Sequence, residues 1–247
     1  MEHKQLNTFH LFAGAGGGIL ADLLLGHNPI GACEIEQYPR DVLLARQRDG
    51  ILPNFPIWDD ICTLDGKPWR GTVDVLAGGF PCQDISPART NNDVNGSIKG
   101  LDGERSGLWS EMARLVEEIQ PRFVFVENSS NLRTKGLHIV LQDLDQLGYN
   151  TRRCKLGSLH VGADHYRQRQ WILAYSNLPQ REGGGLSSRI HPKNTNTCSA
   201  NWGKGKSPVE RVANGMAHRV DRLKAIGNGQ DARVAAFAFN ILSRGLI

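Results

Sequence analysis

A lone cysteine stands directly behind a proline in the stretch GGFPCQDIS, residues 78–86. A cysteine thiolate is a strong nucleophile, and a partly exposed, electropositive position favours that ionised form. A buried cysteine that only fills space is the plainer interpretation of Cys82. We favour a nucleophile, because Gly78 and Gly79 leave space beside it, Pro81 stiffens the turn and polar residues follow.

Two later apolar runs carry groups that could assist a nucleophile. The run FVFVENSS contains Glu127, a carboxyl group that can donate or accept a proton. The run HYRQRQWILAYS contains Arg167 and Arg169, whose side chains lie on one side of an extended chain. A cysteine protease would need a histidine partner, and no local signature nominates one. We therefore expect a nucleophile, an acid and cations to meet at one edge of a sheet.

A glycine-rich stretch, FAGAGGG, follows the first apolar run, and its backbone can approach a ligand closely. It is a poor dinucleotide fingerprint, because GxGxxG counted from Gly14 would need glycine where Ile19 stands. Glu34 ends the second apolar run, where a carboxylate can accept hydrogen bonds from ribose hydroxyls. Asp60 follows the third, shorter apolar stretch. Together these residues favour a nucleoside-bearing cofactor over a tight turn with unrelated surface acids.

The elements that must position these residues alternate along the chain. Strands are expected at 8–14, 29–35, 73–79, 122–128, 151–159 and 170–176, and helices at 19–27, 39–49, 108–120 and 137–148. Continuous apolar strands alternating with helices predict an α/β fold, a doubly wound and mostly parallel sheet with helices on both faces. Ligands in such sheets bind outside the carboxyl ends of the strands.

The chain divides into three expected parts. Residues 1–176 form a catalytic and cofactor-binding domain. Residues 177–217 are rich in Gly, Ser, Asn, Pro and Lys, which predicts a short irregular segment. Residues 218–247 end in an apolar helix that returns to the catalytic domain.

Composition narrows the class of protein. The 247 residues are 40% hydrophobic, enough to bury a full core. The five cysteines form no CxxC pair, which argues against a disulfide framework and a zinc ribbon. No run reaches the ~20 apolar residues of a membrane span, and no signal peptide is recognisable. We expect a soluble protein of a reducing compartment, without metal or membrane.

Positive charge is concentrated late in the chain. Residues 181–224 hold nine Lys or Arg against three acidic residues, although the whole chain has a net charge of only +4. A run of basic residues like this one usually forms a solvated surface. The alternative is a patch that binds the phosphates of a nucleic acid, because basic side chains gain affinity for phosphates by releasing the counterions condensed on them. Composition does not choose between them.

In their order along the chain, FHLFAGAGGG, ACEIEQY, DDI, GGFPCQDIS, GLDGERSGLWSEMARLV, FVFVENSSNL, HYRQRQWILA and RLKAIGNG resemble the successive motifs of DNA (cytosine-5) methyltransferases. The likeness is strongest to the phage-borne and restriction-linked kind, and it spans residues 8–240 except the stretch near 177–210. Pro-Cys-Gln with a later Glu-Asn and Arg-x-Arg is highly specific as a combination. The last motif departs from the usual Gly-Asn-Ser-Val, because GNGQD stands here.

The resemblance implies a class I S-adenosylmethionine-dependent methyltransferase fold and a role for each matched residue. Cys82 would add to C6 of a flipped-out cytosine, Glu127 would hold and protonate N3, and Arg169 would contact O2 and orient Glu127. Arg167 would lie near the site and the backbone. S-adenosyl-L-methionine would be the methyl donor and S-adenosyl-L-homocysteine the product. The implied cofactor contacts are Phe12, Gly14, Gly16, Glu34, Ile35, Asp60, Ile61, Pro81, Leu108 and Asn228. The expected DNA contacts are Gln83, Ser86, Arg89, Lys204 and Lys206. Trp202 is a candidate for a contact at or near the bases, and a small local core of the short segment is the equal alternative for it.

The resemblance also implies the partners. DNA, double-stranded, would be bound by a monomer in the cytoplasm of a bacterium or a phage-infected cell, and a cognate restriction endonuclease would be a further partner. Residues 86–105 would form a lid over the target strand, and residues 177–217 a recognition segment that is short for the family. An RNA-directed cytosine-5 methyltransferase is an alternative, although such enzymes depart from Pro-Cys-Gln. A non-catalytic relative would have lost Cys82 or Glu127, and a nicotinamide oxidoreductase is disfavoured by the glycine pattern.

Overall fold

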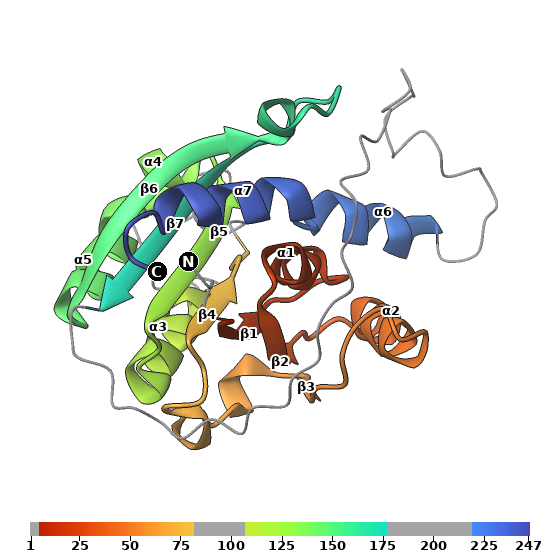
Figure 1. Ribbon diagram of the computed structural model, residues 1–247, viewed down its shortest axis with the longest axis horizontal. Helices are drawn as coiled ribbons and strands as arrows, with labels where there is room; N and C mark the ends of the chain where they lie inside the picture. Colours follow the sequence, from red (N-terminus) through yellow and green to blue (C-terminus); the bar gives the residue numbers. More distant parts are fainter. Residues whose placement is uncertain (1–4, 82–106, 177–218) are drawn as a thin grey trace, which may run out of the picture.

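The structure, a computed structural model, describes residues 5–81, 107–176 and 219–247 (Figure 1). Its strands form one seven-stranded sheet in the order β3-β2-β1-β4-β5-β7-β6. β7 is antiparallel to both of its neighbours, and every other recorded pair of adjacent strands is parallel. The strands are β1 (Asn7–Leu11), β2 (Asn28–Cys33), β3 (Ile57–Trp58), β4 (Val75–Gly78), β5 (Phe123–Ser129), β6 (Tyr149–Gly157) and β7 (Gln168–Ser176).

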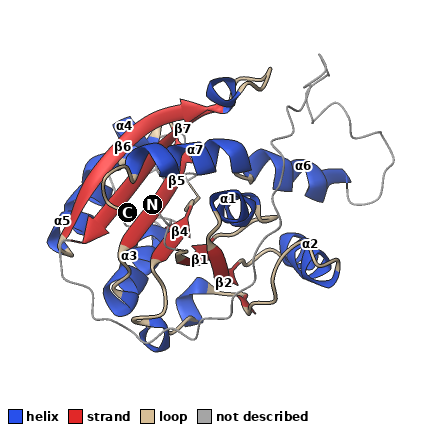
Figure 2. Cartoon of the chain, in the orientation of Figure 1, coloured by secondary structure: helices blue, strands red, loops and turns tan. Residues whose placement is uncertain are grey.

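Helices cover both faces of this sheet (Figure 2). They are α1 (Gly17–Leu25), α2 (Gln37–Arg48), α3 (Gly107–Ile119), α4 (Leu132–Lys135), α5 (Leu137–Gln146), α6 (Arg219–Asn228) and α7 (Ala232–Leu242). Short 3₁₀ turns lie at Ile61–Thr63, Lys67–Trp69 and Ser158–Val161. The predicted α/β class with a mostly parallel sheet is confirmed. No helix within the described ranges is long and apolar enough to cross a membrane.

The two faces of the sheet bury different halves of each strand, because successive side chains point in opposite directions. On β4 and β5, Leu76, Val124 and Val126 pack in the cluster that contains residues of α3 and α5. Their neighbours Val75, Ala77, Phe123 and Phe125 pack in the cluster that contains residues of α1 and α7. Burial on both faces explains the continuous apolar runs of these strands. It also places α7, from the end of the chain, against the face that carries Phe125.

A buried polar cluster joins β1 to α1 beneath this face. One carboxylate oxygen of Asp22 lies 2.5 Å from Thr8 Oγ1 and 2.5 Å from His10 Nε2, and the other lies 3.7 Å from His27 Nδ1. Burial raises the pKa of Asp22, but the charge of His10 and the hydrogen bonds from His10 and Thr8 outweigh it and lower the pKa to about 2. The cluster therefore holds an ionised carboxylate inside the fold.

Asp22→Asn is expected to lower the free energy of unfolding by roughly 2 kcal/mol at neutral pH, the value of a pKa depression of this size. Because the folded-state pKa lies below the ordinary 3.8, the contribution is complete above pH 3.8 and is lost as pH falls towards 2. Urea unfolding at pH 7 and pH 3 measures the free energy of unfolding of both proteins, and the difference between Asp22→Asn and wild type should be smaller at pH 3 than at pH 7. Asp145→Asn, which changes an exposed carboxylate on α5, is the matched control. A loss of equal size at both pH values would contradict the electrostatic origin.

Candidate active site

The acid of the site is a buried carboxyl group at the end of β5. Strand periodicity places Glu127 on the same face as Phe125, and Glu127 pairs with Trp171 of β7. Arg169 is two residues from Trp171, so it lies diagonally across from Glu127 on that face, within reach of a long side chain. Its Nε lies 2.9 Å from Oε1 of Glu127. The two strands thus bring the predicted acid and one predicted cation into direct contact.

Burial is the main influence on this carboxyl group, and it raises the pKa of Glu127 above its ordinary value. The charges of Arg169 and Arg167 and hydrogen bonds from Gln230 and Arg169 act in the opposite direction. A raised pKa keeps more of the group protonated near neutral pH, which suits a carboxyl group that must give a proton to a weakly basic nitrogen.

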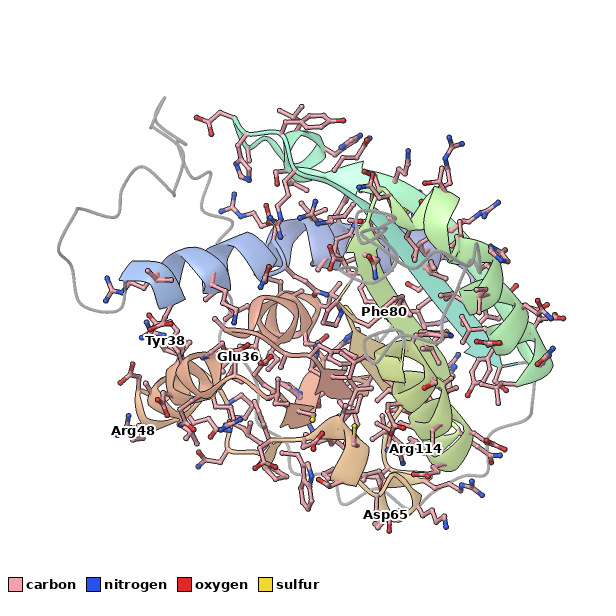
Figure 3. All side chains as sticks on the ribbon, turned by 180° about the vertical axis from the view of Figure 1, so that it is seen from behind. Glu36, Tyr38, Arg48, Asp65, Phe80 and Arg114 are labelled. Carbon is pink, nitrogen blue, oxygen red and sulfur yellow. The ribbon has the colours of Figure 1, made fainter. Side chains whose placement is uncertain are left out.

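The chain that leads into Cys82 is fixed to the same strand. The side-chain amide of Asn128, next to Glu127, donates to the backbone oxygen of Phe80 at 3.0 Å. The Phe80 ring, labelled in Figure 3, lies 5.3 Å from the Trp109 ring, and both side chains are buried. The indole N–H of Trp109 donates to Asp143 on α5 at 2.7 Å. These contacts hold the residues just before Cys82 beside the end of β5.

The described cysteines are poor nucleophiles. Burial raises the pKa of the Cys33 thiol to about 12 and that of Cys154 to about 11. The pKa of Cys62 is raised as well, by partial burial and by its neighbour Asp60. Ionisation near neutral pH is therefore disfavoured at all three.

A second part of the site is the turn after β1. Phe12 and Gly14 both have φ of +53° and Gly16 has φ of +89°, left-handed values that end β1 at Leu11 instead of continuing the strand predicted to residue 14. Glu34, buried at the end of β2, accepts hydrogen bonds from the backbone N–H of Gly14 at 2.7 Å and of Glu36 at 2.8 Å. The carboxylate is held rigidly at the carboxyl ends of β1 and β2.

An exposed apolar side chain adjoins this carboxylate. Ile35 is 68% exposed, which is unusual for isoleucine. The side chain of Arg40, from α2, fixes the backbone here by donating to the carbonyl oxygens of Glu34 at 2.9 Å and Ile35 at 2.5 Å. The next residue, Glu36, labelled in Figure 3, stands just before α2, and Lys224 of α6 forms a 2.6 Å ion pair with it.

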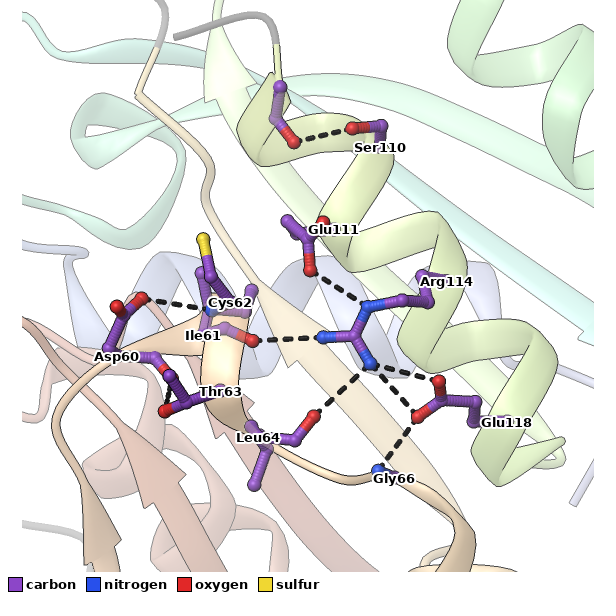
Figure 4. A network of polar contacts seen from close by, with 11 residues as sticks. Asp60, Ile61, Cys62, Thr63, Leu64, Gly66, Ser110, Glu111, Arg114 and Glu118 are labelled. Carbon is purple, nitrogen blue, oxygen red and sulfur yellow. Dashed lines mark hydrogen bonds and ion pairs between the residues drawn. The ribbon is translucent and has the colours of Figure 1, made fainter. Parts of the chain in front are cut away.

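A network around Arg114 of α3 positions the third strand end (Figure 4). The guanidinium group donates to the carbonyl oxygens of Ile61 at 2.9 Å and Leu64 at 3.1 Å, and it pairs with Glu111 and Glu118. Asp60 begins the 3₁₀ turn, its side chain accepting from Cys62 N–H at 2.9 Å. Asp60 and the buried Ile61 are thus tied to α3.

Arg167 takes a different position from Arg169. Its guanidinium group donates to the carbonyl oxygens of Gly227 at 3.0 Å and Gly229 at 2.6 Å, at the end of α6. Burial and the charge of Arg169 lower its pKa. Arg167 therefore joins the start of β7 to the C-terminal segment, which also carries the exposed Asn228.

Comparison with known proteins decides the family. The family described as C-5 cytosine-specific DNA methylase matches residues 6–231. The chain belongs to this family. M.CviJI, a type II methyltransferase of Paramecium bursaria Chlorella virus IL3A, is 30% identical over 172 residues, which are 69% of this chain and 43% of that protein. M.Eco47II of Escherichia coli is 32% identical over 72% of this chain and 41% of its own length. M.HhaI of Haemophilus parahaemolyticus is 29% identical over 72% of this chain and 52% of its own length.

Solved structures support the fold of the family. A putative DNA modification methyltransferase encoded within an E. coli prophage has a TM-score of 0.54 at 22% identity, over 70% of this chain and 47% of that one. The S. pombe Dnmt2 methyltransferase has a TM-score of 0.55 at 19% identity, over 72% of this chain and 53% of that one. The chain thus spans about half the length of the family members it matches.

Several residues implied by the family resemblance remain predictions. Cys82, Gln83, Ser86, Arg89, Trp202, Lys204 and Lys206 lie outside the described residues, as do the expected lid and the whole of the expected recognition segment. Of the other implied cofactor contacts, Pro81 is exposed and Leu108 is half-buried at the start of α3.

Two residues that the motifs did not single out as functional also belong to this site. Asn128 was noted only as part of Glu-Asn, although its amide joins β5 to Phe80. In the motif comparison Gln230 is only part of a departure from the family, but its side-chain amide faces the Glu127 carboxyl group across Gly79 and lowers the pKa of Glu127. The sequence offers one sign that Gln230 has a role, because it is a polar residue directly after the glycine-containing turn of residues 227–229.

Proposed function

We propose that this member of the family is an active DNA (cytosine-5) methyltransferase, which transfers a methyl group from S-adenosyl-L-methionine to C5 of a flipped-out cytosine. The observation that carries the proposal is the ion pair between the buried Glu127 and the half-buried Arg169, fixed through Asn128 to the residues that precede Cys82. A nucleophilic thiol beside a proton-donating carboxyl group is what attack on a pyrimidine ring requires. The similar type II methyltransferases support the same chemistry.

The proposed reaction begins with the thiolate of Cys82, which forms a bond to C6 of cytosine while Glu127 gives its proton to N3. This relieves the negative charge on the ring and makes C5 an enamine-like nucleophile. C5 then takes the methyl group. A base removes the C5 proton, the C6–S bond breaks, the proton on N3 returns to Glu127 and the ring is restored. Arg169 would contact O2 and keep Glu127 oriented, and Arg167 would hold the C-terminal turn.

The residues present fit the proposed cofactor. S-adenosyl-L-methionine supplies an electrophilic methyl carbon on sulfur. No described atom lies within 4 Å of the position a Cβ would take at Gly14, so a ligand can approach the turn of Phe12, Gly14 and Gly16. Glu34 would accept hydrogen bonds from the ribose, and Ile35 would cover the adenine. We propose that Asp60, Ile61, Pro81, Leu108 and Asn228 complete the pocket and that S-adenosyl-L-homocysteine is the product.

The proposed substrate is double-stranded DNA. Opening of the duplex places the target base in the pocket, with Gln83, Ser86 and Arg89 beside it. Lys204 and Lys206 would neutralise phosphates, and residues 177–217 would read the sequence. We further propose that the chain acts as a monomer in the cytoplasm and that a cognate endonuclease exists.

Bisulfite sequencing of plasmid DNA from cells that express the chain tests the function directly. Cytosines at one recognition sequence should resist conversion, because C5-methylcytosine is not deaminated. DNA from cells that express Cys82→Ser should convert fully. Full conversion at every cytosine with the wild-type chain, purified and folded, would contradict the proposal.

Glu34→Ala should weaken the binding of S-adenosyl-L-methionine by roughly tenfold to a hundredfold, because a hydrogen bond to a charged group is worth about 1.5 to 3 kcal/mol. The variant also leaves the N–H groups of Gly14 and Glu36 without their acceptor. Isothermal calorimetry measures the affinity, and Glu117→Ala, an exposed glutamate on α3, is the matched control. Equal affinities of Glu34→Ala and wild type would remove Glu34 from the cofactor site.

A further inference from the structure

The turn between α6 and α7 is anchored on every side. Arg167 donates to the carbonyl oxygens of Gly227 and Gly229. Asp231 caps α7 by accepting from Arg233 N–H at 3.1 Å and Val234 N–H at 3.4 Å, and its other oxygen accepts from Ser158 Oγ at 3.0 Å. The turn therefore holds the residue between them, Gln230, in a fixed place.

Three glycines make room for Gln230. A Cβ at Gly17 would lie 2.1 Å from the backbone oxygen of Gln230, and one at Gly18 would lie 2.6 Å from its side-chain Oε1. A Cβ at Gly79, directly after β4, would lie 2.9 Å from Oε2 of Glu127 and 3.4 Å from Nε2 of Gln230. Real Cβ atoms do not approach other heavy atoms within 3 Å, so Gly17 must lack one because it faces backbone, and a Cβ at Gly18 or Gly79 would displace the side chain of Gln230 or Glu127. Glycines of two separate motifs thus surround one glutamine.

The two ends of the Gln230 amide face different partners. The Nε2 end faces the Glu127 carboxyl group across Gly79: a Cβ there would lie 3.4 Å from Nε2 of Gln230 and 2.9 Å from Oε2 of Glu127, and Gln230 lowers the pKa of Glu127. The Oε1 end lies beside Gly18, where the ring of His10 is also within 3.0 Å of the same Cβ position. Gln230, His10 and Asp22 line one small cavity between α1, α7 and the sheet. The amide thus spans the distance from the buried Asp22 cluster to the acid of the site.

We propose that Gln230 is a positioning residue for the methyl-transfer reaction: its amide holds the Glu127 carboxyl group on the side opposite Arg169, with His10 and Asp22 packed behind it. The inference rests on the proposed function, since Glu127 must be the proton donor for its position to matter. Arg169 approaches Oε1 of Glu127, and Gln230 lies on the side of Oε2. The carboxyl group is therefore held by a strand on one side and by the C-terminal turn on the other.

The contact makes a prediction about pH. The groups that face Glu127 are Arg169 on β7, Arg167 before it and Gln230 on the turn, and each of them lowers the pKa of Glu127 against the effect of burial. Loss of the Gln230 amide removes one of these influences, so the pKa of Glu127 should rise. The alkaline limb of the pH–rate profile, where Glu127 loses its proton, should then move to higher pH.

Gln230→Leu tests the proposal, because it keeps a similar volume and removes the amide. The methyl-transfer rate constant kcat should fall about tenfold, the loss of one hydrogen bond to an ionisable group. KM for S-adenosyl-L-methionine and for DNA should stay within about twofold of wild type, and the alkaline limb should move up. Gln142→Leu makes the same change at an exposed position of α5 and should alter none of these values.

Two further measurements keep the test sharp. Gln230→Glu retains a polar group of the same size and covers the case in which Gln230→Leu folds poorly; its added carboxyl group should also raise the pKa of Glu127. Carbon-13 NMR titration of labelled glutamate, assigned with Glu127→Gln, measures that pKa without DNA.

An inactive wild-type chain would end the proposed function, and the titration would still decide whether Gln230 holds Glu127. If the wild type is active, and Gln230→Leu and Gln230→Glu leave both the alkaline limb of the pH–rate profile and the pKa of Glu127 unchanged, only the role of Gln230 is overturned. A rise in KM for the cofactor with kcat unchanged would also overturn it, because Gln230 would then be a cofactor contact.

Discussion

Cys82→Ser is expected to reduce methyl transfer more than about a thousandfold, as loss of an attacking nucleophile does in other covalent catalysts. Serine fills nearly the same volume, but its hydroxyl group is far less acidic than a thiol and supplies almost no anionic nucleophile near neutral pH. Affinity for S-adenosyl-L-methionine should stay near that of wild type. A radiolabelled methyl-transfer assay and calorimetry on one preparation measure both values.

Cys154→Ser is the matched control, because this half-buried thiol on β6 has its pKa raised to about 11 and no role in the proposed reaction. A duplex with 5-fluorocytosine at the target site adds a direct test. Fluorine cannot leave as the C5 proton does, so a denaturant-resistant adduct should form with wild type and with Cys154→Ser, and not with Cys82→Ser. Turnover by Cys82→Ser at a rate close to wild type would rule out the C6 adduct.

The sequence predicted the parts of the site that depend on where strands end. Glu127 and Glu34 each stand at the end of an apolar run, and in a parallel sheet such ends meet at one edge. The contact between Glu127 and Arg169 does not follow from this rule, because Arg169 stands at the start of β7 and meets the end of β5 only because the two strands are antiparallel. The apolar pattern of β7 could not show whether this strand is parallel or antiparallel to β5, because a buried strand has the same apolar composition in both cases.

The parts that were missed depend on a chain segment far away in sequence. Its spacing predicts that Arg167 acts together with Arg169, but its guanidinium group donates to the carbonyl oxygens of Gly227 and Gly229. The sequence pattern places Gly17 and Gly18 in the expected cofactor turn, but the structure packs Gln230 against both. Local pattern carries no information on which distant residue will fill the space that a glycine leaves. Only the return of α7 to the sheet determines it.

Glu127→Gln is the second change with a large expected effect. The carboxamide has the size of the carboxyl group, but it has no acidic proton to give to N3 of cytosine. Loss of a general acid costs roughly a hundredfold to ten-thousandfold in rate. A single-turnover assay across pH should therefore show a lower rate and no alkaline limb, because the group that titrates is gone. Glu117→Gln, at an exposed position of α3, should leave both rate and pH profile unchanged.

Stability separates this loss of activity from a loss of fold. Burial raises the folded-state pKa of Glu127 above its ordinary 4.5, so the ionised carboxyl group costs stability as pH rises through that range. A neutral amide removes the cost, and the free energy of unfolding of Glu127→Gln at pH 8 should equal or exceed that of wild type in urea. A variant that is inactive and also clearly less stable at pH 8 would mean that the Glu127–Arg169 pair holds the sheet edge together, and the assignment of Glu127 as the proton donor would then lose its support.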